Sequence, residues 1–468
     1  MAKAVYGSAD PIAAIATTLG QSALTVVRTS GEGSLDLLRG VFSRPERLGT
    51  AAGGTIVRGW IRAPDGEGAP VLIDEVLVSV YRRPRSYTGE EGADLSCHGG
   101  MAAGRAVLAA LKAAGFREAL PGEFTFRAFM NGKLDLTRAE SVMEIVAART
   151  DTGREHAVGR LSGVLEREIR SVQALLVDVL ARAELFLDYS EDEAGDGAAE
   201  DEREGVLPGR REAGEALERL RRLSAAWSRE RLYQEGALVV IAGRPNAGKS
   251  SLFNLLLREE RSIVTEIPGT TRDWIEAGVS IAGIPVRLVD TAGLRAPSSG
   301  ADPVERIGMA RSRDLLSLAD LVIYLIDGLE GMGDEDRAFQ SPAPVLTVWN
   351  KIDAAPLPAL PAQMPGISAK TGAGLEELCR VTAGMLEAAA GGAAAEAGAA
   401  PGTLRQKELV DEALGAVEEA LAAESRGEPL DIIAASLRNG INALGEITGE
   451  VSTADILEAM FSKFCVGK

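Results

Sequence analysis

The chain has 468 residues, of which 46% are hydrophobic and 25% are charged, and its 50 basic and 68 acidic side chains leave a formal net charge of −18. This composition excludes wholesale disorder, and at about 150 residues per domain the length predicts about three domains. A general nucleic-acid coat is also excluded because a polyanion would be repelled, although a local basic patch can still dock RNA.

The sequence carries few groups for disulfides or metal centres. Its three cysteines are scattered and its histidines number two, which argues against a disulfide framework and a histidine-based metal site and favours a reducing cytoplasm. The first residues lack the pattern of a signal peptide, and no apolar run is long enough to span a membrane. We therefore expect a cytoplasmic protein with no membrane partner.

The first part of the chain, residues 1–118, mixes short β-rich runs with turns. Residues 23–27 and 76–80 are rich in β-branched side chains and are predicted to be strands. Residues 102–114, rich in alanine and leucine, are predicted to be a helix. This pattern predicts an α+β domain.

Helical periodicity dominates two later blocks. In 154–187 apolar residues recur every three or four positions, from Leu165 to Ala183, and a second amphipathic helix covers about 210–234. The same spacing returns at 409–421, 432–444 and 456–461. The acidic segment 188–204 and the Ala/Gly-rich segment 388–402 are predicted to be exposed loops or linkers.

Between these blocks, residues 236–385 alternate strands with helices. Strands are predicted at 237–242, 285–290, 320–326 and 344–349, which favours a doubly wound parallel sheet inserted into a helical domain. The fold class is thus multi-domain: an α+β N-terminal domain, an α-helical domain and an inserted α/β domain. The predicted boundaries are 1–118, 119–235, 236–385 and 386–468.

A P-loop follows the first strand of this middle segment. Gly243-Arg-Pro-Asn246-Ala247-Gly248-Lys249-Ser250 matches GxxxxGK[ST] and runs into a helix that starts near Ser251. Its amides can surround phosphates, Lys249 can place a charge on them, and Ser250 can ligate Mg²⁺. A chance glycine-rich turn is the alternative, but the strand-loop-helix context favours a nucleotide site of the Ras-like type.

Two further motifs indicate a guanine nucleotide. Asn350-Lys351-Ile352-Asp353 ends a strand, and its aspartate can accept from guanine N1–H and the 2-amino group, neither of which adenine offers. Ser368-Ala369-Lys370 is the expected companion loop. An ATPase is the weaker alternative.

Two motifs are expected to sense the phosphates. Asp290-Thr291-Ala292-Gly293 suits contact with the γ-phosphate and Mg²⁺, and Gly269-Thr270-Thr271 supplies a threonine, Thr271, for Mg²⁺. The residue after Gly293 is Leu294, where Ras-type enzymes carry a water-orienting glutamine. The attacking water therefore needs another guide.

In the order of its parts the whole chain resembles the MnmE (TrmE) family of tRNA-modification GTPases. The motifs that carry the resemblance are Ser86-Tyr-Thr-Gly-Glu90, Cys97-His-Gly-Gly100, Pro121-Gly-Glu-Phe-Thr125, Asn131-Gly-Lys133-Leu-Asp-Leu136, Pro268-Gly-Thr-Thr-Arg-Asp273 and Phe464-Cys465-Val-Gly-Lys468. The last departs slightly, with Val466 in place of isoleucine.

The resemblance implies an activity and partners. Members form a 5-aminomethyl-type group, typically carboxymethylaminomethyl, on the wobble uridine (position 34) of certain tRNAs. They act with the FAD-dependent partner MnmG, as homodimers joined through the N-terminal domain, and use a one-carbon unit from 5-formyltetrahydrofolate or a related folate.

The resemblance also implies the GTP site and its metals. GTP is expected to contact Asn246, Ala247, Gly248, Lys249, Ser250, Ser251, Thr265, Glu266, Ile267, Pro268, Gly269, Thr270, Thr271, Asp290, Thr291, Ala292, Gly293, Asn350, Lys351, Asp353, Ser368, Ala369 and Lys370. Mg²⁺ is expected on Ser250 and Thr271, and K⁺ on Asn246, Thr265, Ile267 and Thr270. Catalytic candidates are Lys249 and Glu305, the latter as the guide for water, although the loop before Glu305 is about three residues longer than usual in the family.

The folate site implied by the resemblance comprises Arg28, Asp94, Lys133 and Lys468. The cations suit the folate carboxylates, whereas Asp94 replaces the usual glutamate and is one methylene shorter. Cys465 is a candidate for the modification chemistry, with a buried structural cysteine as the alternative.

Two other functions stay open. An assembly or regulatory GTPase that gates ribosome maturation would share the nucleotide motifs but would not require residues 1–118 or the Cys465 tail. A folate-binding structural subunit could use its GTPase domain only to switch interactions. The effect of Lys249→Ala on wobble modification separates these possibilities.

Overall fold

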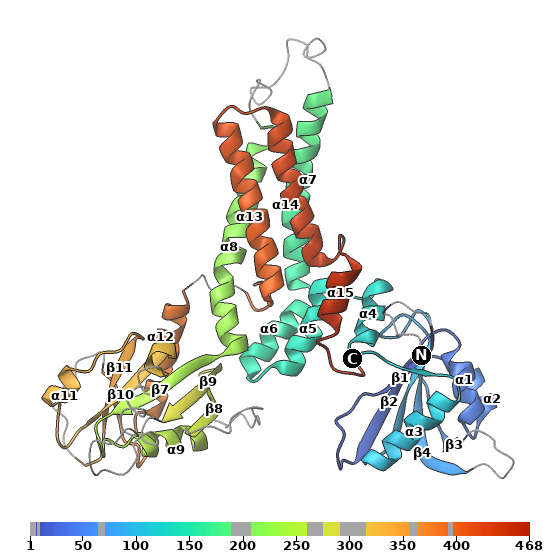
Figure 1. Cartoon of the computed structure of the whole chain (residues 1–468), viewed down its shortest axis with the longest axis horizontal. Coiled ribbons are helices and arrows are strands. Elements are labelled where there is room, and N and C mark those ends of the chain that lie inside the picture. The colour runs from blue at the N-terminus through green and yellow to red at the C-terminus, as the bar shows by residue number, and fades with distance from the viewer. Residues whose placement is uncertain are drawn as a thin grey trace, which may run out of the picture. The chain divides into compact units, whose positions relative to one another are not determined.

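The computed structural model describes residues 6, 10–63, 71–188, 207–259, 275–290, 315–354, 364–391 and 396–468. Its contacts divide the chain into two compact units (Figure 1), one formed by Met1–Met143 with Gly445–Lys468 and the other by Glu144–Leu444. None of the described helices is long and apolar enough to cross a membrane. The four-part domain division stays a prediction.

The first unit is built on a six-stranded sheet. Its strands are β1 (Ile12–Ile15), β2 (Leu24–Ser30), β3 (Ile56–Arg62), β4 (Leu72–Tyr81), β5 (Gly92–His98) and β6 (Arg117–Glu118), in the order β3-β4-β5-β2-β1-β6. The neighbouring strands are antiparallel except β1 and β6. The strands predicted at 23–27 and 76–80 are confirmed as parts of β2 and β4.

Helices α1 (Ser34–Val41) and α3 (Met101–Ala113) pack on this sheet, and α2 (Pro45–Thr50) follows α1. One buried cluster joins Leu38 of α1 and Leu111 of α3 to Val27, Val78 and Leu95 of the strands, all with no exposed surface. The alternation of buried and exposed residues along the strands produces this one-sided core. The helix predicted at 102–114 is confirmed as α3.

The chain end completes the first unit. Helices α4 (Glu123–Met130) and α15 (Ala454–Phe461) meet through Phe126 and Phe461, whose rings stand edge to face at 5.4 Å. Phe464 and Leu136, at the start of α5 (Leu136–Ala147), belong to the same buried cluster. Aromatic pairs of this geometry add to the free energy gained by burial, so the tail is held by its apolar side chains.

A buried ion cluster ties two of the quoted motifs together. Glu123 has no exposed side-chain surface and accepts from Arg117 at 2.6 Å and Arg127 at 2.9 Å. Arg127 also reaches Glu90 at 3.1 Å. Burial opposes ionisation of Glu123, but the bonds from Arg117, Leu120 N–H and Arg127 prevail and lower its pKa. These motif residues therefore have a structural role.

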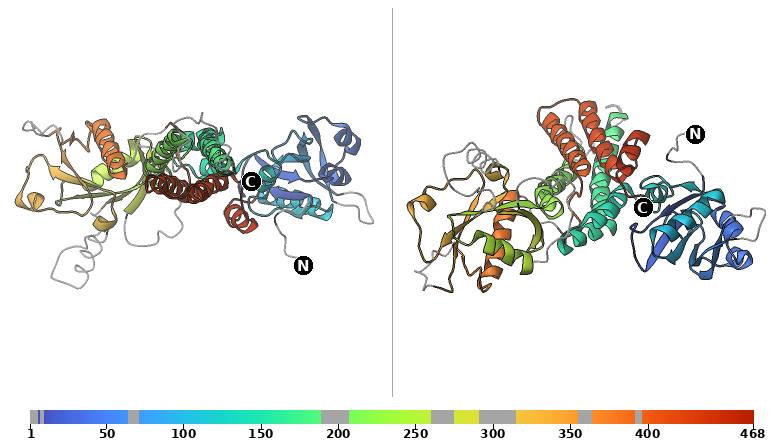
Figure 2. Two further views of the ribbon diagram at one scale, coloured as in Figure 1. Left: turned by 90° about the horizontal axis from the view of Figure 1, so that it is seen from above. Right: turned by 60° about the horizontal axis from the view of Figure 1, so that its bottom comes forward.

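The second unit contains long helices that run side by side (Figures 1 and 2). They are α7 (Val164–Asp188), α8 (Arg210–Glu235), α13 (Leu404–Ser425) and α14 (Leu430–Thr448), preceded by α6 (Asp151–Leu161). The predicted apolar face of α7, from Leu165 to Ala183, is at most 1% exposed and is confirmed. The prediction of one helical stretch over 154–187 is wrong at one point, because the turn at Gly163 (φ 85°) separates α6 from α7.

The Ala/Gly-rich segment 388–402 is not an exposed linker throughout. Helix α12 (Leu375–Ala390) includes its first residues, and Ala400 is only 3% exposed. A Cβ added to Gly398 would lie 2.5 Å from the backbone of Gly159 in α6. The prediction of an exposed linker is therefore wrong for these residues, because glycine here permits close backbone contact. Most of the other predicted loop, 188–204, lies outside the described residues.

The inserted sheet has six described strands: β7 (Ala237–Gly243), β8 (Ile275–Ile281), β9 (Ile284–Asp290), β10 (Leu321–Asp327), β11 (Val345–Asn350) and β12 (Gly366–Ile367). Their order is β12-β11-β10-β7-β9-β8, parallel except for β8, which pairs antiparallel with β9. The four predicted strands are confirmed. The added edge strand β8 reaches β9 through a two-residue turn with positive φ at Ala282 and Gly283.

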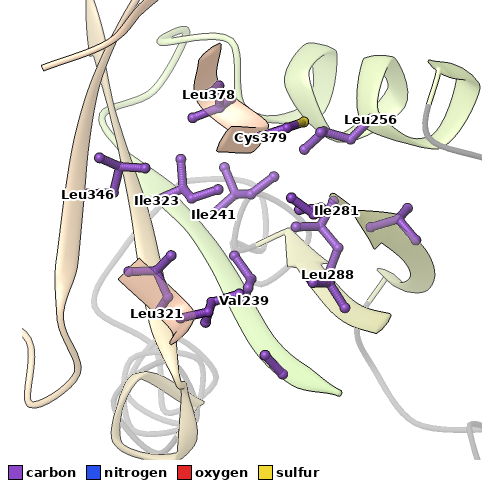
Figure 3. Packing of buried hydrophobic residues seen from close by; sticks show 14 of the residues in the cluster. Val239, Ile241, Leu256, Ile281, Leu288, Leu321, Ile323, Leu346, Leu378 and Cys379 are labelled. Atoms are coloured by element: carbon purple, nitrogen blue, oxygen red, sulfur yellow. The ribbon is translucent and has the colours of Figure 1, made fainter. Parts of the chain in front are cut away.

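Side chains of alternating strand positions fill the two faces of this sheet. Val239 and Ile241 of β7 pack on Leu256 of α9 (Lys249–Glu259) and on Leu378 and Cys379 of α12 (Figure 3). On the other face, Leu238 and Val240 of β7 form a cluster with Leu315. Burial on both faces explains the continuous apolar runs of the parallel strands, whose carboxyl ends carry the motifs described next.

Candidate functional site

The P-loop leaves β7 at Gly243 and enters α9 at Lys249. Gly243 (φ 140°) and Gly248 (φ 98°) have backbone conformations that disfavour larger residues, and Asn246 is left-handed at φ 62°. A Cβ on Gly243 would lie 2.4 Å from the carbonyl oxygen of Leu325. Glycine is therefore required by close packing and backbone shape.

Lys249 and Ser250 follow the loop as the motif predicts. The Lys249 Nζ donates to the carbonyl oxygens of Gly243 at 3.0 Å and Arg244 at 2.9 Å. The Ser250 hydroxyl donates to the buried carboxylate of Asp290 at 2.7 Å. A hydroxyl and a carboxylate oxygen at one place are the donor set that Mg²⁺ uses beside a nucleotide, so these residues fit the ion.

The loop predicted to recognise guanine is joined directly to the P-loop. The Asn350 side-chain amide donates to the Ala247 carbonyl at 2.8 Å, and its oxygen accepts from the Ala369 amide at 3.0 Å. A Cβ on Gly248 would lie 2.1 Å from the Asn350 amide nitrogen. One buried side chain thus holds together the P-loop, the strand end at β11 and the loop Ser368-Ala369-Lys370.

Asp353 is positioned by Ser368, whose hydroxyl donates to it at 2.7 Å. That bond is the main cause that lowers the pKa of Asp353 below its ordinary value. Lys351 forms an ion pair with Asp327 at 2.6 Å. Burial opposes ionisation of Asp327, but the Lys351 bond and the Leu329 amide prevail and lower its pKa.

The sequence motifs do not predict two residues of this site, Arg244 and Asp327. Arg244 lies inside the P-loop and forms an ion pair with Asp336 at 2.9 Å, and Asp327 ends the apolar strand β10. A charged residue directly after a buried run was a usable signal for Asp327. The partner of Arg244 lies 92 residues away and has no local signal.

Other predicted residues lie outside the described part of the chain: Thr265, Glu266, Ile267, Pro268, Gly269, Thr270, Thr271, Thr291, Ala292, Gly293 and Glu305. Of the four predicted K⁺ ligands, only Asn246 is described. Ala247 is fully buried beside Asn350, whereas Ser251 is exposed at the start of α9.

In the first unit, the structure brings Arg28 and Asp94 together. They face each other across β2 and β5 and form a two-pronged pair at 2.9 and 3.2 Å. Burial opposes the charge on Arg28, but Asp94 prevails and raises its pKa. Tyr81 also donates to Asp94 at 3.3 Å, and burial together with that carboxylate raises the pKa of the tyrosine.

The chain terminus lies beside this pair. Arg28 donates to the Gly467 carbonyl at 3.4 Å, and the Lys468 carbonyl accepts from the Phe124 amide at 3.2 Å. Gly467 (φ 92°) packs so closely on β1 that an added Cβ would lie 2.8 Å from Ile15 O. Cys465 is exposed here, unlike Cys97, whose burial in β5 raises its thiol pKa to about 11. The alternative of a buried cysteine is therefore wrong for Cys465.

The fourth predicted folate residue has a different partner. The Lys133 Nζ donates to the Pro84 carbonyl at 3.2 Å. The residue types fit a ligand with carboxylates and a heteroaromatic edge. Both Asp94 oxygens already accept from Arg28 or Tyr81, so an amino-pyrimidine edge would have to share this carboxylate with those donors.

Two family models match the chain. The one described as MnmE helical domain matches residues 136–465, and the one described as GTP-binding protein TrmE N-terminus matches residues 11–133. Together they include the helical segments, the inserted sheet and the first sheet.

Curated relatives match over nearly the whole length. The tRNA modification GTPase MnmE of Treponema denticola is 42% identical, with 99% of each chain covered. That of Symbiobacterium thermophilum is 41% identical over 98% of this chain and 99% of its own. Among solved structures, Era from Aquifex aeolicus bound to GDP·AlF4⁻ is 28% identical over 38% of this chain and 66% of its own, with a TM-score of 0.26. By its family models and full-length relatives, the chain belongs to the MnmE family of tRNA-modification GTPases.

Proposed function

We propose that this chain hydrolyses GTP and, with the FAD-dependent partner MnmG, installs a carboxymethylaminomethyl-type group on the wobble uridine of certain tRNAs. The observation that carries the proposal is the joint formed by Asn350, which bonds the P-loop at Ala247 and the guanine loop at Ala369. This joint supports the proposal because it connects the phosphate loop to the loops that would bind the guanine base.

Hydrolysis in this proposal performs conformational work, and the uridine chemistry takes place elsewhere. Lys249 and the loop amides would hold the phosphates. Ser250 and Thr271 would hold Mg²⁺, with Asp290 accepting from the Ser250 hydroxyl, and Glu305 would orient the attacking water. Because the Leu294 side chain cannot orient the attacking water, another polar residue such as Glu305 is required for that role. Homodimerisation through the N-terminal domain would bring two such GTPase domains into one assembly.

The one-carbon chemistry is assigned to the first unit. Arg28, Lys133 and Lys468 would bind the carboxylates of 5-formyltetrahydrofolate or a related folate, and Asp94 its amino-pyrimidine edge. The folate would supply the one-carbon unit. Cys465 is exposed and lies two residues before Gly467, whose carbonyl accepts from Arg28, which supports a chemical role for its thiol.

Potassium dependence is the part of the proposal that is simplest to test. Asn246 already has the left-handed backbone of a loop that can face an ion, and Thr265, Ile267 and Thr270 would complete the ligand set. A monovalent cation there would neutralise charge between the β- and γ-phosphates. GTP turnover by the purified full chain is expected to fall at least about 10-fold when KCl is replaced by NaCl at equal ionic strength. Equal rates in the two salts would contradict the cation site.

The cellular function is tested by Lys249→Ala. The variant is expected to abolish wobble-uridine modification, measured by mass spectrometry of tRNA nucleosides, because the phosphates lose their main charged contact. Lys112→Ala serves as the control, since Lys112 is exposed and pairs only weakly with Glu118 at the surface. Normal modification with accumulated ribosome precursors would favour the assembly switch, and normal results in both assays would contradict a need for GTP.

A further inference from the structure

Arg244, the second residue of the P-loop, connects the loop to the chain between β10 and β11. Its guanidinium donates to the Gly331 carbonyl at 2.6 Å, and its Nε lies 2.9 Å from Asp336. A third contact reaches Glu330 at 3.3 Å. The arginine is thus fixed from three directions, with only 22% of its side chain exposed.

Asp336, in the short helix α11 (Asp334–Arg337), is the buried end of this anchor. Its side chain has no exposed surface and also accepts from the Gly333 amide at 2.8 Å and the Tyr324 hydroxyl at 3.0 Å. Burial and this bond raise the pKa of Tyr324 to about 12, so the phenol stays a donor. A carboxylate held by several donors has a fixed position. The ion pair with Asp336 therefore also fixes the Arg244 guanidinium.

The contacts of Arg244 with Asp336 and Gly331 also affect Lys249 and the P-loop amides, which would bind the phosphates. The carbonyl of Arg244 accepts from the Lys249 Nζ at 2.9 Å, and also from the Ala247 amide at 3.3 Å. The far half of the loop is held by Asn350 through Ala247. Asn246, left-handed at φ 62°, lies between these two attachment points. The P-loop is therefore held at two points. Arg244 forms one attachment and Asn350 forms the other.

We infer that Arg244 is a positioning residue for GTP hydrolysis, which through Asp336 and Gly331 keeps the P-loop amides and Lys249 oriented for the transfer of the phosphate. This inference rests on the proposed GTPase activity. The two glycines of the loop, Gly243 and Gly248, have positive φ and leave its backbone free at both ends. Catalysis by fixed amides requires them to be oriented before the substrate arrives. Gly331 and Asp336, in the connection between β10 and β11, would orient the loop through their contacts with Arg244.

The test compares Arg244→Lys and Asp336→Asn with the wild type, in full chains assayed for GTP turnover in saturating KCl. Lysine keeps the charge but cannot contact Asp336 and Gly331 together, and asparagine keeps the shape without the charge. Each variant is expected to lose about 10- to 100-fold in kcat, as for a small displacement of reacting groups, with the larger change in kcat than in KM.

Two further variants separate positioning from general loss of stability. Arg337→Gln alters an exposed arginine of the same helix, paired with Asp334 at 3.2 Å, and is expected to leave kcat unchanged. Tyr324→Phe removes a bond to Asp336 without touching the P-loop and is expected to lower the melting temperature while it retains most of kcat. A wild-type kcat in Arg244→Lys, or equal losses in Tyr324→Phe and Arg244→Lys, would overturn the inference. A wild-type chain that does not hydrolyse GTP would instead overturn the proposed function.

Discussion

Replacement of Asp353 by asparagine is expected to lower the affinity for GTP about 100-fold or more and to create binding of xanthosine triphosphate. In the proposed site the carboxylate would accept from N–H groups of guanine, and the Ser368 hydroxyl that donates to it fixes its orientation. An amide presents a donor where guanine also presents one, whereas xanthine has a carbonyl at that position. Binding of both nucleotides, measured by fluorescence or calorimetry with the full chain, checks the exchange of preference.

The control for this variant is Asp334→Asn, which changes the same residue type at a fully exposed position of α11. It should leave both affinities at their wild-type values, since surface pairs contribute little. Unchanged preference for GTP in Asp353→Asn would show that the base is recognised by other residues.

The nucleotide site could be predicted in large part because its signals are local. Strand β7 is a continuous apolar run that ends in the P-loop, and β11 ends in Asn350. The carboxyl ends of parallel strands gather at one edge of a sheet, so strand prediction and motif order together place these residues in one site. The bond from Asn350 to Ala247 joins residues 103 positions apart and was outside such reasoning.

What could not be predicted depends on partners distant in sequence. The sequence predicts an exposed loop or linker around Gly398 and Gly402, yet their missing side chains permit contact with α6 and its Arg160. Arg28 and Asp94 were each assigned to folate, but the register of β2 and β5 makes them partners of each other. Composition cannot distinguish a glycine of a linker from one of a close contact, and a single residue type does not reveal its ion-pair partner.

The largest expected effect on stability concerns Arg160, a fully buried arginine of α6. It forms ion pairs with Glu144 at 2.6 Å and Glu230 at 2.8 Å, and it donates to the Ala400 carbonyl at 3.4 Å. Arg160→Met is expected to lower the free energy of unfolding by about 3–5 kcal/mol, because it leaves buried carboxylates without their cation. Urea denaturation of the full chain, followed by helical circular dichroism, measures this loss.

The control is Arg221→Met on α8, whose ion pairs with Glu218 and Glu418 are exposed. Its expected cost is below about 1 kcal/mol. Methionine keeps much of the side-chain packing but removes the charge. An equally small loss in both variants would therefore mean that Arg160 stabilises the fold by packing and not by compensating the buried carboxylates.

The pH dependence of the Arg160→Met effect separates these causes further. In the wild type, burial opposes ionisation of Glu230, but His156 and Arg160 prevail and lower its pKa. A carboxylate whose pKa is lowered by folding stabilises the folded state at pH values above the usual glutamate pKa of about 4.3. This contribution is lost as the pH falls through the pKa of the folded state. Without Arg160 the pKa of Glu230 should rise above the usual glutamate value, so that protonation relieves the variant at pH values where Glu230 of the wild type is still ionised. The difference in stability should therefore shrink from pH 7.5 toward pH 4.5, whereas the cost of a cavity would stay constant over that range.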